Sequence, residues 1–158
     1  MHRRVLLSRF ALGAAAGLLG GAVAGPRAAR ADSLAAKVVT VFRSPTCGCC
    51  KAWIEHMEAA GFQIRDNVTD AMAAVKRRYG VPEAMESCHT AVVDGYVIEG
   101  HVPAADVRRL LAERPKVRGI AAPGMPVGSP GMEMGDRVDS YRVFSFADGG
   151  RAAVFAAH

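Results

Sequence analysis

Apolar residues along this chain repeat with two different periods, which predicts alternating strands and helices. The run 38–42 is β-branched and aromatic, as expected for a buried strand. Between residues 48 and 60, Cys50, Trp53, Ile54 and Met57 recur at the spacing of one helix face. Residues 62–66 alternate apolar and polar positions and predict a second strand.

The following segment predicts a second helix, with Thr69 as its N-cap and with Gly80 and Pro82 at its end. One face of this helix is apolar and holds Met72, Val75 and Tyr79. The basic residues Lys76, Arg77 and Arg78 are expected on the face that is exposed to solvent.

Residues 90–93 and 96–100 flank Asp94-Gly95, which is typical of a β-hairpin. A third helix is predicted from Pro103 until Pro115 stops it. Segments 141–146 and 151–155 predict a terminal hairpin. The order is β-α-β-α-β-β-α with a C-terminal β-hairpin, which predicts an α/β fold of the thioredoxin-like type.

The first 31 residues differ from the rest in charge. They hold five arginines and no acidic residue, so the formal net charge of +5 belongs to this leader and the remainder is neutral. Arg3-Arg4, a short apolar run over 10–24 and the Ala29-Arg30-Ala31 cleavage pattern predict a twin-arginine-like export signal over 1–31. We therefore expect a lead-in over 32–37 and one periplasmic domain over 38–158 that is not membrane-embedded and has no nucleic-acid partner.

Three of the four cysteines, Cys47, Cys49 and Cys50, lie where the first strand turns into the first helix. Helix N-termini lower thiol pKa values and favour thiolate chemistry. Cys47 and Cys50 also form the Cys-x-x-Cys pair of thioredoxin-like redox proteins. Because Cys49 and Cys50 are adjacent, we expect these three cysteines to form no stabilising disulfide among themselves. At most one of them is expected to pair with Cys88.

Thioredoxins carry a cis-proline just before their third strand, and here that segment reads Cys88-His89-Thr90. His89 stands at the matching position, and we expect no cis bond there, because a non-proline cis peptide costs about 2.5–4 kcal/mol. The predicted fold brings Cys88 beside the trio, and four converging thiolates favour a soft metal. Adjacent cysteines suit ions that share bridging sulfurs, and nearby methionines select Cu(I) over zinc, so copper is the expected metal.

Several motifs together resemble the bacterial family of unknown function that includes the CopG-type periplasmic copper-resistance proteins. These motifs are Cys47-Gly48-Cys49-Cys50, Tyr79-Gly80-Val81-Pro82, Ser87-Cys88-His89-Thr90, 95–103 and 124–133. The resemblance covers the chain from about residue 37 to its end. It implies a thioredoxin-like fold and a cysteine-bridged multinuclear copper cluster, with Cys47, Cys49, Cys50 and Cys88 as ligands.

Other residues are weaker candidates. His89 either binds metal, orients a thiolate or is a polar residue at a strand start. Met125 and Met132 lie in a Gly/Pro-rich loop and are either accessory copper ligands or packing residues. We expect His101 to make a structural hydrogen bond and His56 to be solvated. Trp53, Met57 and Met72 are assigned to the core, and His158 to a free terminus.

The sequence therefore predicts a periplasmic protein that holds Cu(I) in copper resistance or homeostasis, with a copper donor or acceptor protein as partner. Two alternatives stay open. One is a thiol-disulfide oxidoreductase using Cys47 and Cys50, and the other is a carrier that hands copper to another protein. Whether the protein is an enzyme is left open.

Overall fold

The computed structural model describes residues 37–158, so the predicted export signal and residues 32–36 lie outside it. The strands are β1 (Val38–Arg43), β2 (Gln63–Val68), β3 (His89–Val93), β4 (Tyr96–Glu99), β5 (Gly119–Ala121), β6 (Arg142–Phe146) and β7 (Ala152–Ala157). The helices are α2 (Gly48–Ala59), α3 (Met72–Tyr79) and α4 (Ala104–Glu113), with a short 3-10 turn, η1 (Glu83–Met85). Within residues 37–158, no helix has the length and apolar character needed to cross a membrane.

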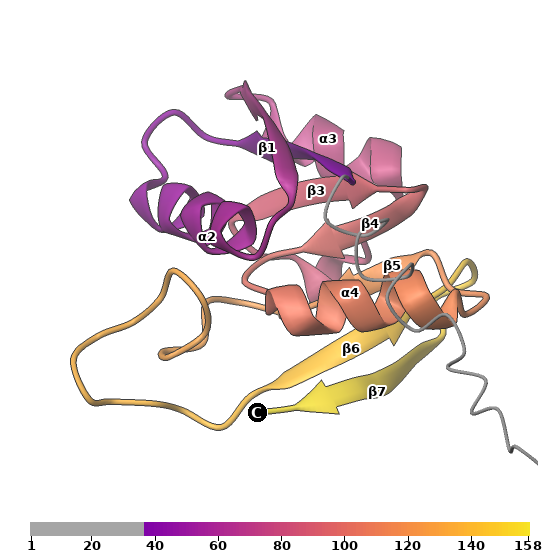
Figure 1. Cartoon of the computed structure of the whole chain (residues 1–158). Coiled ribbons are helices and arrows are strands. Elements are labelled where there is room, and N and C mark those ends of the chain that lie inside the picture. The colour runs from indigo at the N-terminus through magenta and orange to yellow at the C-terminus, as the bar shows by residue number, and fades with distance from the viewer. Residues whose placement is uncertain (1–36) are drawn as a thin grey trace, which may run out of the picture.

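The seven strands form one sheet in the order β2-β1-β3-β4-β5-β6-β7. β1 and β2 are parallel and are connected through α2, whereas β3 is antiparallel to both β1 and β4. The C-terminal hairpin β6–β7 extends the sheet beyond β5. Figure 1 shows this arrangement, with a long loop between β5 and β6 running below α2. The predicted mixed α/β fold is confirmed, and the predicted elements occur in the expected order, with one strand that was not predicted, β5, between α4 and the C-terminal hairpin.

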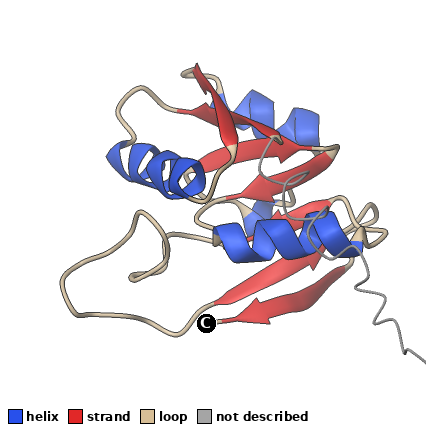
Figure 2. Ribbon diagram, in the orientation of Figure 1, coloured by secondary structure: helices blue, strands red, loops and turns tan. Residues whose placement is uncertain are grey.

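Helices cover both faces of the sheet (Figure 2). α2 and α4 share a core on one face, where Trp53, Met57, Val107 and Leu110 are fully buried. A smaller cluster on the other face holds Val97 and Phe146, with Tyr79 at the end of α3 packed against it. Successive side chains of a strand point to opposite faces, so β4 sends Ile98 to the first core and Val97 to the second.

The prediction for the basic side of α3 is wrong at one position. Arg77 and Arg78 are exposed as expected, but the side chain of Lys76 is only 7% exposed. Lys76 turns inward because it forms an ion pair with the fully buried Glu99 of β4. The predicted cap also shifts: Ala71 is the N-cap of α3, while Thr69 accepts a hydrogen bond from the Ala71 N–H at 3.1 Å.

Two histidines that we expected to be solvated or free have partners on α4. His56 is half-buried, and its Nε2 accepts a hydrogen bond from the Ala104 N–H at the start of α4. His158 lies 2.8 Å from Asp106 and stacks on Tyr141. Both predictions were wrong because the partners come from a helix distant in sequence.

Candidate metal centre

The sheet topology brings the four cysteines to one end of the domain. β1 and β3 are antiparallel, with Arg43 opposite His89, so the turn after β1 lies beside the residue that precedes β3. That turn leads into α2, for which Cys47 is the N-cap residue, and Cys88 immediately precedes β3. The predicted convergence of Cys88 on the cysteine trio is therefore found in the structure.

The four sulfur atoms are close enough to share metal ions. The Sγ atoms of Cys47 and Cys49 are 3.5 Å apart, and those of Cys49 and Cys88 are 3.8 Å apart. All four Sγ atoms lie within 4.8 Å of one another. Cys50 is buried beneath the other three, which are half-buried. Such spacing is short enough for one ion to contact several sulfurs and for one sulfur to bridge two ions.

Cys47 and Cys50 form a disulfide, whereas Cys49 and Cys88 are free. This finding corrects the expectation that the trio would pair at most through Cys88. The first turn of α2 places the Cα atoms of Cys47 and Cys50 5.4 Å apart, within the ordinary range for a disulfide. The Cys-x-x-Cys spacing was thus the better guide to pairing than the crowding of adjacent thiols.

Burial raises the pKa of the Cys88 thiol to about 12, and the nearby Cys49 contributes in the same direction. Without a metal, Cys88 is therefore a protonated thiol at neutral pH. A soft cation bound here would stabilise the thiolate directly, so Cys88 would lose its proton on binding it. No cis peptide bond occurs in residues 37–158, which confirms the expectation for the bond before His89.

Two histidines adjoin Cys88. His101 Nε2 lies 2.9 Å from Cys88 Sγ, and His89 Nδ1 lies 3.4 Å from the same sulfur. The structural hydrogen bond expected for His101 is present, since its Nδ1 lies 2.7 Å from the Pro130 carbonyl. The contact between His101 and Cys88 was not predicted, because the two residues are thirteen positions apart in the sequence.

The methionine-containing loop reaches the cysteine helix at one point. A Cβ on Gly131 would lie 2.7 Å from both the carbonyl oxygen of Cys49 and the backbone nitrogen of Trp53, so only glycine permits the loop to approach α2 this closely. Met132, the next residue, is half-buried and adjoins this contact, whereas Met125 is 54% exposed. The loop thus lies against the N-terminal turn of α2.

A buried polar network holds the chain on the other side of Cys88. Glu99 Oε1 accepts hydrogen bonds from Lys76 and from the Ser87 N–H (2.7 Å), and its Oε2 accepts one from the Thr90 hydroxyl (2.6 Å). Burial raises the pKa of Glu99, and the Lys76 ammonium acts in the opposite direction. This network, which the sequence did not predict, fixes both residues that flank Cys88-His89.

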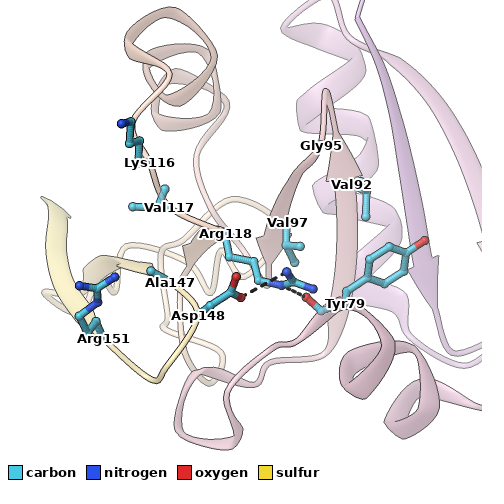
Figure 3. Close-up of a pocket in the computed structure, with 10 residues that line it drawn as sticks. All are labelled: Tyr79, Val92, Gly95, Val97, Lys116, Val117, Arg118, Ala147, Asp148 and Arg151. Atoms are coloured by element: carbon cyan, nitrogen blue, oxygen red, sulfur yellow. Dashed lines mark hydrogen bonds and ion pairs between the residues drawn. The ribbon is translucent and has the colours of Figure 1, made fainter.

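A separate open pocket of about 550 Å³ lies between α3 and the β6–β7 turn (Figure 3). Arg118 crosses it, donating to the Tyr79 carbonyl and pairing with Asp148. Its lining residues include no cysteine or histidine. The pocket therefore adds nothing to the thiol chemistry at the other end of the sheet.

An α/β domain with four clustered cysteines, two of them in a Cys-x-x-Cys pair, belongs to the class of thiol-based metal-binding or redox proteins. Residues 85–132 match the family model described as "Protein of unknown function, DUF411". Among curated proteins, none matches this sequence.

Two solved structures are similar to this chain. One, titled "Copper resistance protein copG- Form 2", is 54% identical with a TM-score of 0.74, and the match covers 77% of this chain and 98% of that one. The second, Form 1 of the same protein, is 55% identical with a TM-score of 0.73, covering 77% and 96%. The chain belongs to the family of this copper resistance protein, which confirms the resemblance found in the sequence motifs.

Proposed function

We propose that this protein binds copper as Cu(I) through Cys47, Cys49, Cys50 and Cys88, in copper resistance or homeostasis. The observation that carries this proposal is the cluster of four sulfur atoms within 4.8 Å of one another. Thiolates select Cu(I), which accepts two or three sulfur ligands and tolerates bridging sulfurs. The name of the similar solved structures supports the choice of metal.

A thiolate-bridged cluster of several copper ions fits this ligand set better than a single tetrahedral ion. Cys49 and Cys50 are adjacent on α2 and differ in burial, so their sulfurs are better placed to bind two neighbouring copper ions than one. The sulfur of Cys47 or Cys88 would then bridge these two ions. Binding through all four requires the Cys47–Cys50 disulfide to be reduced, with the uptake of two electrons and two protons from a thiol reductant. Each thiol then releases its proton as it binds copper.

The wider setting is part of the same proposal. The order β1-α2-β2-α3-β3-β4-α4, with β2-β1-β3-β4 adjacent in the sheet, supports a thioredoxin-like domain over 38–158. The predicted signal over 1–31 favours export to the periplasm, where a copper donor or acceptor protein would exchange metal with this one. Met132, next to the Gly131 contact, is the methionine better placed to assist, and Met125 stays a weaker candidate.

Copper binding is tested with protein that is reduced and loaded under anaerobic conditions. Elemental analysis should find copper bound to the wild-type chain, and the Cys88→Ser variant should bind fewer ions per chain. His56→Gln is the matched control, because it changes a half-buried histidine on α2 outside the cluster. A wild-type protein that takes up no copper, or a Cys88→Ser variant with unchanged stoichiometry, would contradict the proposal.

A second function deserves a test because Cys47 and Cys50 form a disulfide. A thiol-disulfide oxidoreductase would use this pair directly, with Cys49 or Cys88 positioned to resolve a mixed disulfide. Metal-free protein should then reduce insulin disulfides at a rate that Cys47→Ser abolishes. Absence of insulin reduction by the metal-free wild type would rule out this alternative.

A further inference from the structure

Within residues 37–158, a helix covers only part of the sheet face opposite α2 and α4. α3 packs on β1 and β3, at one side of this face. Beyond α3 lie two open hollows of about 550 and 290 Å³, which share the lining residues Lys116, Val117, Ala147 and Arg151. Because they meet at these residues, the two hollows form one continuous feature, the basic groove, whose larger part is drawn in Figure 3.

The basic groove combines an apolar floor with cationic groups around it. Val97 of β4 belongs to the floor and is 3% exposed. The side chains of Lys116, Arg118 and Arg151 supply three positive charges, against one negative charge from Asp148. Outside the leader the chain has as many acidic as basic residues, so this excess of positive charge is a local feature of one surface.

Two of these cations are not neutralised by the protein itself. Within residues 37–158, neither Lys116 nor Arg151 has an acidic partner at ion-pair distance, and both residues are exposed. An apolar centre with a polar rim is the usual composition of a protein–protein interface. The groove therefore has both the charge and the apolar surface to bind a partner that is acidic.

Arg118 crosses the groove in a fixed orientation. Its Nε donates to the Tyr79 carbonyl at 2.8 Å, and its Nη1 lies 3.3 Å from Asp148 Oδ1 (Figure 3). Gly80 leaves room for this guanidinium, since a Cβ on Gly80 would lie 2.7 Å from Arg118 Nε. A guanidinium held in this way presents its Nη groups to carboxylates, which match its planar fork.

Asp148 occupies the position that an acidic ligand would take at Arg118. The Asp148 side chain is 86% exposed and that of Arg118 is 39% exposed, so solvent screens their attraction. Exposed ion pairs of this kind contribute little to stability. A carboxylate from another molecule can therefore replace Asp148 at the guanidinium at little cost to the fold.

We propose that the basic groove binds an acidic segment of another protein. One carboxylate of that segment replaces Asp148 at Arg118, and an apolar side chain covers Val97. Further carboxylates pair with Lys116 and Arg151. A single small anion, or the phosphates of a nucleic acid, would engage the cations but leave the apolar floor exposed to water.

The chain's own leader is not the occupant, because residues 1–31 contain no acidic residue. The inference goes beyond the proposed copper function, since no cysteine or histidine lines the groove. It is therefore tested on metal-free protein, and a negative result leaves the copper proposal unaffected.

Binding of synthetic peptides to the full chain provides the test. The probe is a peptide with one leucine flanked on both sides by glutamates, added to isotope-labelled protein and followed by NMR. A second peptide has serine in place of leucine, and a third has glutamine in place of glutamate. Lys116→Glu and Arg151→Glu are the groove variants, and Lys51→Glu, which changes an exposed lysine on α2, is the matched control.

The leucine peptide should shift the amide signals of Val97, Val117 and Arg118 in a saturable way. Each groove variant should bind it at least about fivefold less tightly, because an attraction becomes a repulsion. Asp148→Asn should bind it about two- to fivefold more tightly, since the competing carboxylate is gone. The serine peptide should bind at least about threefold less tightly, the glutamine peptide should not bind, and Lys51→Glu should equal wild type.

Absence of saturable shifts in the wild-type groove would overturn the proposal, as would unchanged affinity in Lys116→Glu and Arg151→Glu. Equal affinity for the leucine and serine peptides would also overturn it, because attraction by charge alone would then account for binding. Tighter binding of a short DNA duplex than of the peptide would make the occupant a nucleic acid. Self-association of the chain that Arg151→Glu abolishes would make it a second copy, and either result rejects an acidic partner protein.

Discussion

Replacing Lys76 by methionine tests whether the buried ion pair with Glu99 supports the segment that carries Cys88. The Lys76 side chain is 7% exposed and that of Glu99 is fully buried. Removing one partner of such a pair leaves an uncompensated charge and typically costs about 3–5 kcal/mol. With a slope of about 1.5 kcal/mol per molar urea for a domain of this size, the midpoint of unfolding should fall by about 2–3 M.

The double variant Lys76→Met/Glu99→Gln isolates the charge from the hydrogen bonds. Glutamine keeps an acceptor for the Ser87 N–H and can donate to the Thr90 hydroxyl, which has lost its Lys76 donor, so both contacts of residue 99 remain without its charge. The double variant should therefore be more stable than Lys76→Met alone. Arg137→Met is the control, because Arg137 and Asp139 form an exposed pair whose loss should cost less than about 1 kcal/mol.

The pH dependence of Lys76→Met has a definite sign. Burial already raises the pKa of Glu99, and loss of the Lys76 ammonium removes an interaction that opposes this rise. At pH values between the pKa of Glu99 in the unfolded state and its higher pKa in the folded state, the folded protein binds more protons than the unfolded protein. Stability therefore falls as the pH rises through that range. Lowering the pH from 7 toward 5.5 should restore part of the lost stability relative to wild type. A loss below about 1 kcal/mol at pH 7, or strict additivity in the double variant, would refute the reasoning.

Two further predictions concern the surroundings of the cysteines. Gly131→Ala should destabilise the fold by about 1–3 kcal/mol in thermal unfolding, because its φ of +84° and the 2.7 Å approach of a Cβ to the Trp53 nitrogen both exclude a side chain. Gly48→Ala, with open space around its Cβ, should stay within about 1 kcal/mol of wild type, and equal effects at the two glycines would contradict this account. Copper loading should quench the fluorescence of Trp53, the one tryptophan, because its ring lies 4.4 Å from that of His89. Cys88→Ser should weaken the quenching, and a titration with unchanged emission would count against copper binding here.

The elements that the sequence predicted well are those with a clear hydrophobic period. Trp53, Ile54 and Met57 mark the buried face of α2, and all three lie in the main core. β5 was missed because it has three residues, Gly119–Ala121, each buried by pairing on both sides, so it shows no alternation. Short strands of this kind take their conformation from their neighbours in the sheet.

The candidate site was predictable where local spacing decides it and obscure where distant residues meet. Cys47, Cys49 and Cys50 stand together in the sequence, and the fold order sufficed to place Cys88 beside them. Lys76 gave no such signal, because three consecutive basic residues on an eight-residue helix leave the inward one undetermined. Its burial depends on Glu99, which lies twenty-three residues away on β4.

The β3–β4 hairpin connects these features, because its two faces carry different parts of the support for Cys88. Thr90 and Glu99, paired across the strands, face Lys76, whereas His89 and His101 lie on the opposite side, toward Trp53. Ser87 is held by Glu99, so the position of Cys88 depends on the ion pair although neither charged group reaches the sulfur. Weakening the pair should thus lower copper affinity without removing a ligand. Lys76→Met should bind copper less tightly than wild type, while the sulfur scattering of its loaded form in X-ray absorption stays the same.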